Sequence, residues 1–330
     1  MARRDLLSLG AAVAVSLVAT SCRDGRPTPR EVAPTVPPVR SAQPSAGGPS
    51  KSSVGLTPGH LYYGASVPRH RSLSVWEEQL GRPLSVNRSF FTPDHNETAQ
   101  LVRCCLDDLA HDRLPHVSMK PRGTWQEIAR GAQDEWLASM LVPLAATEAP
   151  VFFTVHHEPE NDAGPPGMQP ADFVAMQRRV IDLAAEKAPQ VVVTPVLQQW
   201  TFDPVRGDID PAEWIVSEAS VLGLDVYNHW SRTNDQPWSS FGTKADEAIS
   251  WLGDTPIAIG EYGCREDPDN PGLAAEWLRD AAQYAREHNI ISMSYFNSDL
   301  NAPDGSWELR GSAEQAFADL LASDWVARPA

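Results

Sequence analysis

From about residue 61 onwards, two kinds of segment alternate along the chain. Short runs rich in β-branched and aromatic residues are followed by polar residues, and then by longer stretches with apolar residues three and four positions apart. The short runs predict β-strands, and the longer stretches predict amphipathic helices. The predicted strands cover residues 61–68, 84–91, 114–120, 151–157, 191–198, 221–227, 256–262 and 290–296.

The predicted helices fill the gaps, at residues 98–110, 125–144, 170–187, 244–251, 273–287 and 312–321. Pro170, Pro211 and Pro271 stand where helices should begin, because proline is well tolerated in the first helical turn. Strands that are apolar on both faces are typical of parallel sheets covered on both sides. Eight such units in series favour an α/β fold, a closed (β/α)8 TIM barrel with a single catalytic domain over residues 59–330. The absence of a G-x-G-x-x-G motif weakens the case for an open dinucleotide-binding sheet.

Residues 1–22 have the pattern of a signal peptide, with a basic start and an apolar run too short to span a bilayer. Arg3-Arg4 resembles a twin-arginine signal, and Ala19-Thr20-Ser21-Cys22 resembles a bacterial lipobox in which Cys22 is lipidated. An ordinary cleaved signal is the alternative. Residues 23–58 are rich in proline and serine and lack an apolar period, which predicts a disordered linker. We therefore expect a secreted lipoprotein that contacts the outer face of the bacterial cell membrane only through its anchor.

The formal net charge of −16 argues against nucleic acid as a partner, because an acidic protein repels phosphate backbones. We expect a monomer. Besides Cys22 the chain has Cys104, Cys105 and Cys264, an odd number, so at least one thiol is unpaired or bonded outside the chain. A disulfide from Cys264 to Cys104 or Cys105 stays open.

Two glutamates follow directly on apolar strands: Glu158 on the fourth predicted strand and Glu261 on the seventh. A carboxylate at such a place is costly unless it has a function or a partner. The two strands face each other across an eight-stranded barrel, and reacting residues of such barrels lie at the carboxyl ends of strands. Two carboxyl groups about 5–5.5 Å apart can perform retaining glycoside hydrolysis. The alternative is that each glutamate is a structural ion-pair partner.

The residues around both glutamates resemble a known clan. His157-Glu158 and Ile259-Gly260-Glu261-Tyr262-Gly263 resemble the motifs of the retaining (β/α)8 glycoside hydrolases. The histidine before Glu158, together with Gly223-Leu224-Asp225-Val226-Tyr227, resembles glycoside hydrolase family 26, the β-mannanases and related endo-hydrolases. The resemblance implies an enzyme that cleaves β-linked polysaccharide, a β-mannan or a related neutral glycan, without a metal or cofactor.

By this resemblance, Glu158 is the acid/base and Glu261 the nucleophile, His157 lies in the substrate site, and Tyr227 orients the nucleophile. Arg88 fits the arginine that many clan members have on the second strand. The chain departs from the family in two places. Pro159-Glu160-Asn161-Asp162 follows Glu158 where the family often has Met-Asn-Gly, and Phe296 stands where a sugar-stacking tryptophan is common.

Sugar binding also requires aromatic faces and polar groups near the carboxylates. The further candidates lie after predicted strands and are Asn161, Gln199, Trp200, Asp225, Asn228, His229, Trp230, Trp238, Phe296 and Trp307. The alternative for each aromatic residue is packing within its loop.

The sequence leaves two other functions open. A metal hydrolase could use His156, His157, Glu158 and His229, but adjacent histidines on a strand face opposite ways, and neither H-x-H nor H-E-x-x-H occurs. A non-catalytic carbohydrate-binding lipoprotein on the same barrel is the second alternative. The sequence leaves open which polysaccharide is bound and whether cleavage is endo or exo.

Overall fold

The computed structural model describes residues 56–329, except 68–70, 148, 301 and 303. The predicted signal segment, Cys22 and the predicted linker up to residue 55 lie outside the described residues, so these predictions stay predictions. In the part of the chain that the structure describes, no helix has both the length and the apolar character that a membrane crossing requires.

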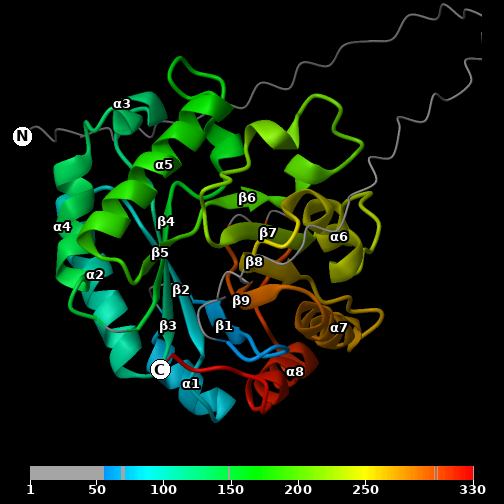
Figure 1. Cartoon of the computed structure of the whole chain (residues 1–330). Helices are drawn as coiled ribbons and strands as arrows, with labels where there is room; N and C mark the ends of the chain where they lie inside the picture. Colours follow the sequence, from blue (N-terminus) through cyan, green and yellow to red (C-terminus); the bar gives the residue numbers. More distant parts are fainter. Residues whose placement is uncertain (1–55, 68–70, 148, 301, 303, 330) are drawn as a thin grey trace, which may run out of the picture. The chain divides into compact units, whose positions relative to one another are not determined.

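Parallel strands form the centre of the fold (Figure 1). Within the described residues, nine strand segments lie in the order β5-β4-β3-β2-β1-β9-β8-β7-β6. Their bounds are β1 (Tyr62–Ser66), β2 (Val86–Phe91), β3 (Leu114–Met119), β4 (Val151–Val155), β5 (Val191–Val193), β6 (Val196–Gln198), β7 (Leu222–Asn228), β8 (Ile257–Cys264) and β9 (Ile290–Phe296).

The segments β5 and β6 are two halves of the fifth predicted strand, interrupted at Thr194-Pro195, because proline has no N–H for a strand ladder. The first half pairs with β4 and the second with β7. At the interruption, the Thr194 N–H donates to the Phe153 carbonyl (2.9 Å) and the Gly223 N–H donates to the Pro195 carbonyl (2.6 Å). The fifth strand therefore joins the two ends of the sheet and closes the barrel, and the predicted (β/α)8 fold is confirmed.

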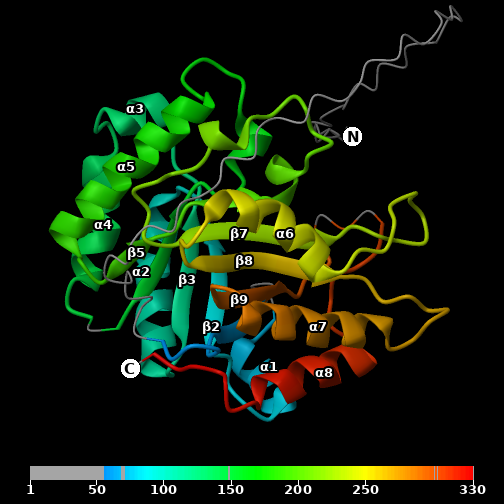
Figure 2. The same ribbon diagram turned by 45° about the vertical axis from the view of Figure 1, so that its right-hand side comes forward.

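Helices cover the outside of the strands: α2, α4 and α5 pack on one side, and α6, α7 and α8 on the other (Figures 1 and 2). Their bounds are α1 (Leu73–Leu80), α2 (His95–Ala110), α3 (Trp125–Ala129), α4 (Asp134–Leu144), α5 (Pro170–Lys187), α6 (Phe241–Leu252), α7 (Leu273–Glu287) and α8 (Gly311–Leu321). Helices α5 and α7 have the predicted bounds, and α2, α6 and α8 begin one to three residues earlier than predicted.

The helix predicted over residues 125–144 was wrong in one respect, because it is two helices. Gly131 adopts a φ of 90°, a left-handed conformation that a continuous helix cannot contain, and it separates α3 from α4. At the start of α3, the Thr124 hydroxyl accepts the Glu127 N–H (3.2 Å) while the Glu127 carboxylate accepts the Thr124 N–H (2.8 Å). This capping box fixes where α3 begins.

Two other segments also differ from the prediction. Helix α1 was not predicted, although its ends carry ordinary signals: Ser72 caps the N-terminus and Gly81 ends the helix in the left-handed conformation. Pro211 begins only the short 3-10 helix η3 (Pro211–Glu213), so the predicted start of an α-helix there was wrong. Between β6 and β7 the described chain has 3-10 turns in place of an α-helix.

The barrel interior changes character along its axis. Its amino-terminal layer is apolar and consists of Tyr62, Val86, Leu114, Phe152, Val221, Ala258 and Ile291. The next positions towards the carboxyl ends include the buried polar residues Arg88, His116 and Thr154. The Thr154 hydroxyl donates to the Thr194 carbonyl (2.8 Å) and lies 3.3 Å from His116 Nε2. Polar groups are therefore collected at the end of the barrel where Glu158 and Glu261 lie.

Candidate active site

A strained turn carries Glu158 beyond the end of β4. His156 and Glu158 have φ values of 63° and 47°, a region that costs a residue with a side chain of the order of 1 kcal/mol or more. Neighbouring strands hold the turn, because the His156 N–H donates to the Met119 carbonyl (2.9 Å) and the Glu158 N–H donates to the Val196 carbonyl (3.0 Å). The backbone of the glutamate is therefore fixed from both sides.

The ring of His156 also holds this turn in place, through hydrogen bonds at both of its nitrogens. Its Nδ1 accepts the indole N–H of Trp125 (2.8 Å), so the proton sits on Nε2, which donates to Asp162 (2.8 Å). Asp162 ends the short 3-10 helix η1 (Pro159–Asp162) and also pairs with Lys120 (2.6 Å). Burial lowers the pKa of His156, so the ring is neutral. Because both of its nitrogens are occupied, His156 cannot join the metal-ligand set considered from the sequence.

Glu261 is placed by an irregularity between β7 and β8. Leu224 pairs with Ile259, but Asp225 pairs with Glu261, so Gly260 is skipped in the register. A Cβ at Gly260 would lie 2.7 Å from Asp225 Oδ1, a distance that real Cβ atoms do not adopt. The missing side chain therefore lets the Asp225 carboxyl lie beside that of Glu261.

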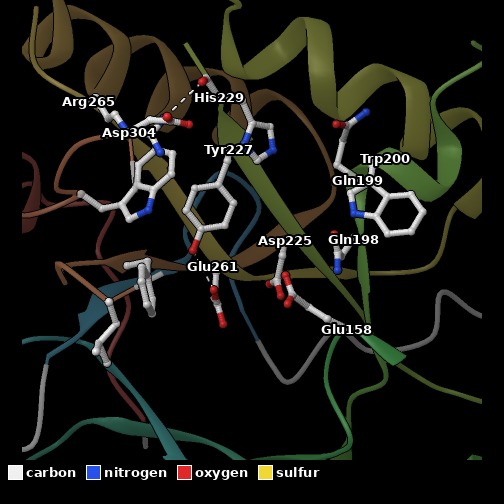
Figure 3. A pocket seen from close by; sticks show the side chains of 13 residues that line it. Glu158, Gln198, Gln199, Trp200, Asp225, Tyr227, His229, Glu261, Arg265 and Asp304 are labelled. Carbon is white, nitrogen blue, oxygen red and sulfur yellow. Dashed lines mark hydrogen bonds between the residues drawn. The ribbon is translucent and has the colours of Figure 1, made fainter. Parts of the chain in front are cut away.

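Three carboxyl groups converge over the mouth of the barrel (Figure 3). One oxygen each of Glu158, Asp225 and Glu261 lie within 4.8 Å of one another. The Tyr227 hydroxyl donates to Glu261 Oε2 at 2.6 Å. Arg88 lies close by and is 1% exposed, and none of its guanidinium nitrogens has a hydrogen-bond partner in the described chain. The positive charge of Arg88 therefore acts on all three carboxyl groups, and no hydrogen bond directs it to one of them.

The protonation states follow from burial and from the mutual repulsion of these carboxyls. Burial, the charge of Glu261 and the charge of Glu160 raise the pKa of Glu158 to about 8. Burial, with the charges of Glu261 and Glu158, raises the pKa of Asp225 well above its usual range. Burial also raises the pKa of Glu261, but Arg88 and the Tyr227 hydroxyl oppose that rise. Glu261 is therefore the carboxyl of the three that is best able to be ionised.

A cavity of about 320 Å³ opens over the carboxyls (Figure 3). It is lined by Glu158, Gln198, Gln199, Trp200, Asp225, Tyr227, His229, Glu261, Arg265, Phe296, Leu300, Asp304 and Trp307. The structure thus brings together nine of the predicted site residues, which are Glu158, Gln199, Trp200, Asp225, Tyr227, His229, Glu261, Phe296 and Trp307. Aromatic faces and polar groups share its wall.

Other predicted residues lie outside this lining. Asn161 is exposed, although its side-chain amide donates to Glu158 Oε2 (3.1 Å). The His157 ring packs against Phe90 with 5.2 Å between centroids, and burial and the charge of Arg88 lower the pKa of His157 to about 3. His157 is not among the residues that line this cavity.

The prediction of Trp230 as a sugar-binding residue does not agree with its position. Its ring packs edge-on against Trp238, with 5.4 Å between centroids, and does not line the cavity. The Trp230 ring therefore packs within its loop, which is the alternative that the sequence left open.

Several cavity residues were not predicted, namely Gln198, Arg265, Leu300 and Asp304. Arg265 lies 3.6 Å above the centre of the Trp307 ring and donates to the carbonyls of His229 and Trp230. Asp304 comes from the loop after β9. Because loops carry no periodic pattern, only the position of Arg265, just beyond the strand of Glu261, could have indicated it from the sequence.

The described residues offer one place where carboxylates could share a cation, the same group of Glu158, Asp225 and Glu261. Arg88 already supplies positive charge to this group. The thiols of Cys104, Cys105 and Cys264 are all free, so the disulfide left open by the sequence is not formed.

Comparison with known proteins gives a likeness of fold. No protein-family model matches the sequence, and no curated protein matches it. The structure is similar to that of GH26A from Muricauda sp. (14% identity, TM-score 0.50, covering 75% of this chain and 86% of that one). It is also similar to an endo-β-1,4-mannanase double mutant of Cellulomonas fimi (13% identity, TM-score 0.55, 82% and 73%). A third similar structure is GH5_18 from Streptomyces cattleya in complex with GlcNAc (16% identity, TM-score 0.57, 79% and 80%). At these identities, the comparisons show that the chain has the (β/α)8 fold of glycoside hydrolases of families 26 and 5.

Proposed function

We propose that the protein is a retaining β-glycoside hydrolase in which Glu158 is the acid/base and Glu261 the nucleophile. The observation that carries the proposal is the spacing of carboxyl oxygens, within 4.8 Å for Glu158 and Glu261. Retaining enzymes have their two carboxyl groups about 5–5.5 Å apart, whereas inverting enzymes need about 6.5–9.5 Å to admit a water molecule. The close spacing supports attack by a carboxylate on the sugar itself.

In the first step, Glu158 donates its proton to the glycosidic oxygen while a Glu261 oxygen bonds to the anomeric carbon and the leaving group departs as an alcohol. In the second step, the ionised Glu158 takes a proton from water, the water oxygen bonds to the anomeric carbon, and Glu261 leaves as carboxylate. A pKa of about 8 keeps Glu158 protonated at neutral pH. The Tyr227 hydroxyl, 2.6 Å from Glu261 Oε2, stabilises the ionised nucleophile.

Asp225 balances the charge of the site. With its pKa raised well above the usual range, it stays neutral, so that Glu261 is left as the anion beside Arg88. A neutral carboxyl can donate a hydrogen bond, and neither oxygen of Asp225 has a partner within the described chain. Asp225 therefore serves as a donor or acceptor for a sugar hydroxyl.

The shape of the site supports an oligosaccharide or polysaccharide substrate. A second cavity of about 530 Å³ shares Gln199, Trp200, His229, Arg265 and Asp304 with the first, so the binding space continues past these residues, away from the carboxyls. The net charge of −16 disfavours strongly anionic glycans. We propose a β-mannan or a related neutral β-linked glycan, in keeping with the mannanase among the similar structures.

The decisive experiment is product analysis on mannans, β-glucans and xylans, with the anomeric configuration followed by NMR at early times. We expect a β-configured product from the wild type, and turnover lowered by at least about a thousandfold in Glu158→Gln and Glu261→Gln. Glu127→Gln, at an exposed capping residue, is the matched control. An α-configured early product, or variants as active as the wild type, would overturn the roles. Binding of a glycan without turnover by the wild type would instead support the non-catalytic alternative.

The proposed location of the enzyme is the outer face of the cell membrane, through a lipid on Cys22. Metabolic labelling with a fatty acid tests this: the wild-type protein should carry label, and a Cys22→Ala variant should not.

A further inference from the structure

The turn that carries Glu158 contains another buried carboxyl, that of Glu160, which takes no part in the two-carboxylate reaction. Its Oε1 accepts the Gln198 N–H at 3.0 Å and the Thr201 hydroxyl. Its Oε2 is buried and has no hydrogen-bond partner within the described chain. A carboxyl that is buried and incompletely paired is costly, so its place requires a reason.

The two donors belong to the segment that forms the neighbouring wall of the cavity. Gln198 ends β6, and Thr201 lies in the 3-10 helix η2 (Gln199–Phe202), which also carries Trp200. Glu160 lies two residues after Glu158, inside η1. The carboxyl of Glu160 therefore connects the strained turn of Glu158 to the segment that presents Gln198, Gln199 and Trp200 to the cavity.

We propose that Glu160 is a positioning residue for Glu158: it ties the turn of the acid/base to the cavity wall and holds a second carboxyl close to that of Glu158. The inference rests on the proposed function, because it assigns Glu160 a role in the activity of that site.

The electrostatics of the turn agree with this geometry. The charged groups that act on Glu158 are Glu261 on β8, Glu160 on η1, Arg88 on β2 and Lys120 after β3, and Asp225 on β7 lies beside it. Glu261 and Glu160 raise the pKa of Glu158, and Arg88 and Lys120 lower it. Burial raises the pKa of Glu160 itself to about 7, so Glu160 is ionised in the range where Glu158, with a pKa of about 8, gives up its proton.

The test uses Glu160→Gln, which keeps an oxygen for Gln198 and Thr201 but removes the charge. Without that charge the pKa of Glu158 falls, so the basic limb of the pH profile of kcat/KM should move to lower pH by about half a unit or more. Glu160→Ala also removes the acceptor, and we expect kcat to fall at least about tenfold further than in Glu160→Gln, with a smaller change in KM. The exposed Glu213→Gln is the matched control and should leave the limb in place.

Two results would overturn the inference: a basic limb that stays in place in Glu160→Gln, or equal kcat values for the Gln and Ala variants. The first measurement does not depend on whether the Ala variant folds. If the wild type has no turnover, the proposed function fails, but the inference is still testable, because NMR titration of the Glu158 side-chain carboxyl in the wild type and in Glu160→Gln reports the same shift directly. A Glu158 titration that is unchanged by the substitution would refute it in that case too.

Discussion

Replacing Tyr227 with Phe removes one hydrogen bond from the proposed nucleophile and little else. The hydroxyl lies 2.6 Å from Glu261 Oε2, a short bond to a carboxylate. Hydrogen bonds to charged groups contribute about 1.5–3 kcal/mol, which corresponds to about 10- to 150-fold in rate if the stabilisation is lost in the reacting state. The ring itself would stay in place, because it packs at 4.8 Å from Trp307 and 6.2 Å from Phe296 between centroids.

The substitution also shifts the pKa of Glu261, and the direction of that shift follows from the structure. The Tyr227 hydroxyl favours the ionised form of Glu261, so its loss raises the pKa of that carboxyl. Since the nucleophile must be ionised, the acid limb of the pH profile of kcat/KM should move to higher pH, by about one to two units for the same energy.

The assay is the pH dependence of kcat/KM on a chromogenic β-glycoside, with thermal unfolding measured alongside. Tyr262→Phe is the matched control: its hydroxyl donates to the Tyr63 hydroxyl (2.9 Å) in the core, away from the carboxyls. The free energy of unfolding of that variant should be lower by about 1 kcal/mol, and the acid limb of its pH profile should stay in place. If Tyr227→Phe kept the wild-type rate and acid limb, Tyr227 would not stabilise an ionised Glu261, and the charge assignment of the site would be wrong.

Three further outcomes are expected. Gly260→Ala should lower kcat by about tenfold or more, because the added Cβ would lie 2.7 Å from Asp225 Oδ1 and displace that carboxyl; unchanged kinetics would show that the site tolerates the shift. The wild-type basic limb of kcat/KM should lie near pH 8, where Glu158 loses its proton, and a limb below about pH 6 in a pH–rate profile would contradict its role as acid. Arg113→Ala should destabilise the fold by about 3–5 kcal/mol in urea unfolding, because it leaves the buried Asp108 carboxyl without its ion-pair partner (2.8 Å), while kcat stays unchanged in the folded enzyme.

Part of the site could be predicted from the sequence, because strand ends are recognisable. Glu158 follows β4 and Glu261 lies near the carboxyl end of β8, and parallel strands in a barrel bring their carboxyl ends together. Asp225 and Tyr227 are two positions apart on one strand, so they share a face and could be assigned to the same cavity. The two-residue repeat of a strand is enough to predict that Asp225 and Tyr227 lie on the same face.

The remaining features of the site depend on contacts between segments far apart in the chain. Trp230 has the sequence context of a sugar-binding residue, but the position of Trp238 decides that its ring packs within the loop. Arg265 and Asp304 enter the cavity from loops, which have no period to interpret. The break at Gly131 was equally hidden, because a single glycine is compatible with a helix or with its end.

The succession of strands along the chain and the place of Glu158 and Glu261 at or near their carboxyl ends were determined by the sequence alone, since short apolar runs followed by polar residues are local features. Only the tertiary structure decided the distance between the carboxyls and which of them holds a proton. That distance depends on the skipped residue at Gly260 and on the strained backbone of Glu158, and the protonation depends on burial and on Arg88. The physical reason is that electrostatic interactions act through space, between groups that folding brings within a few ångströms of one another.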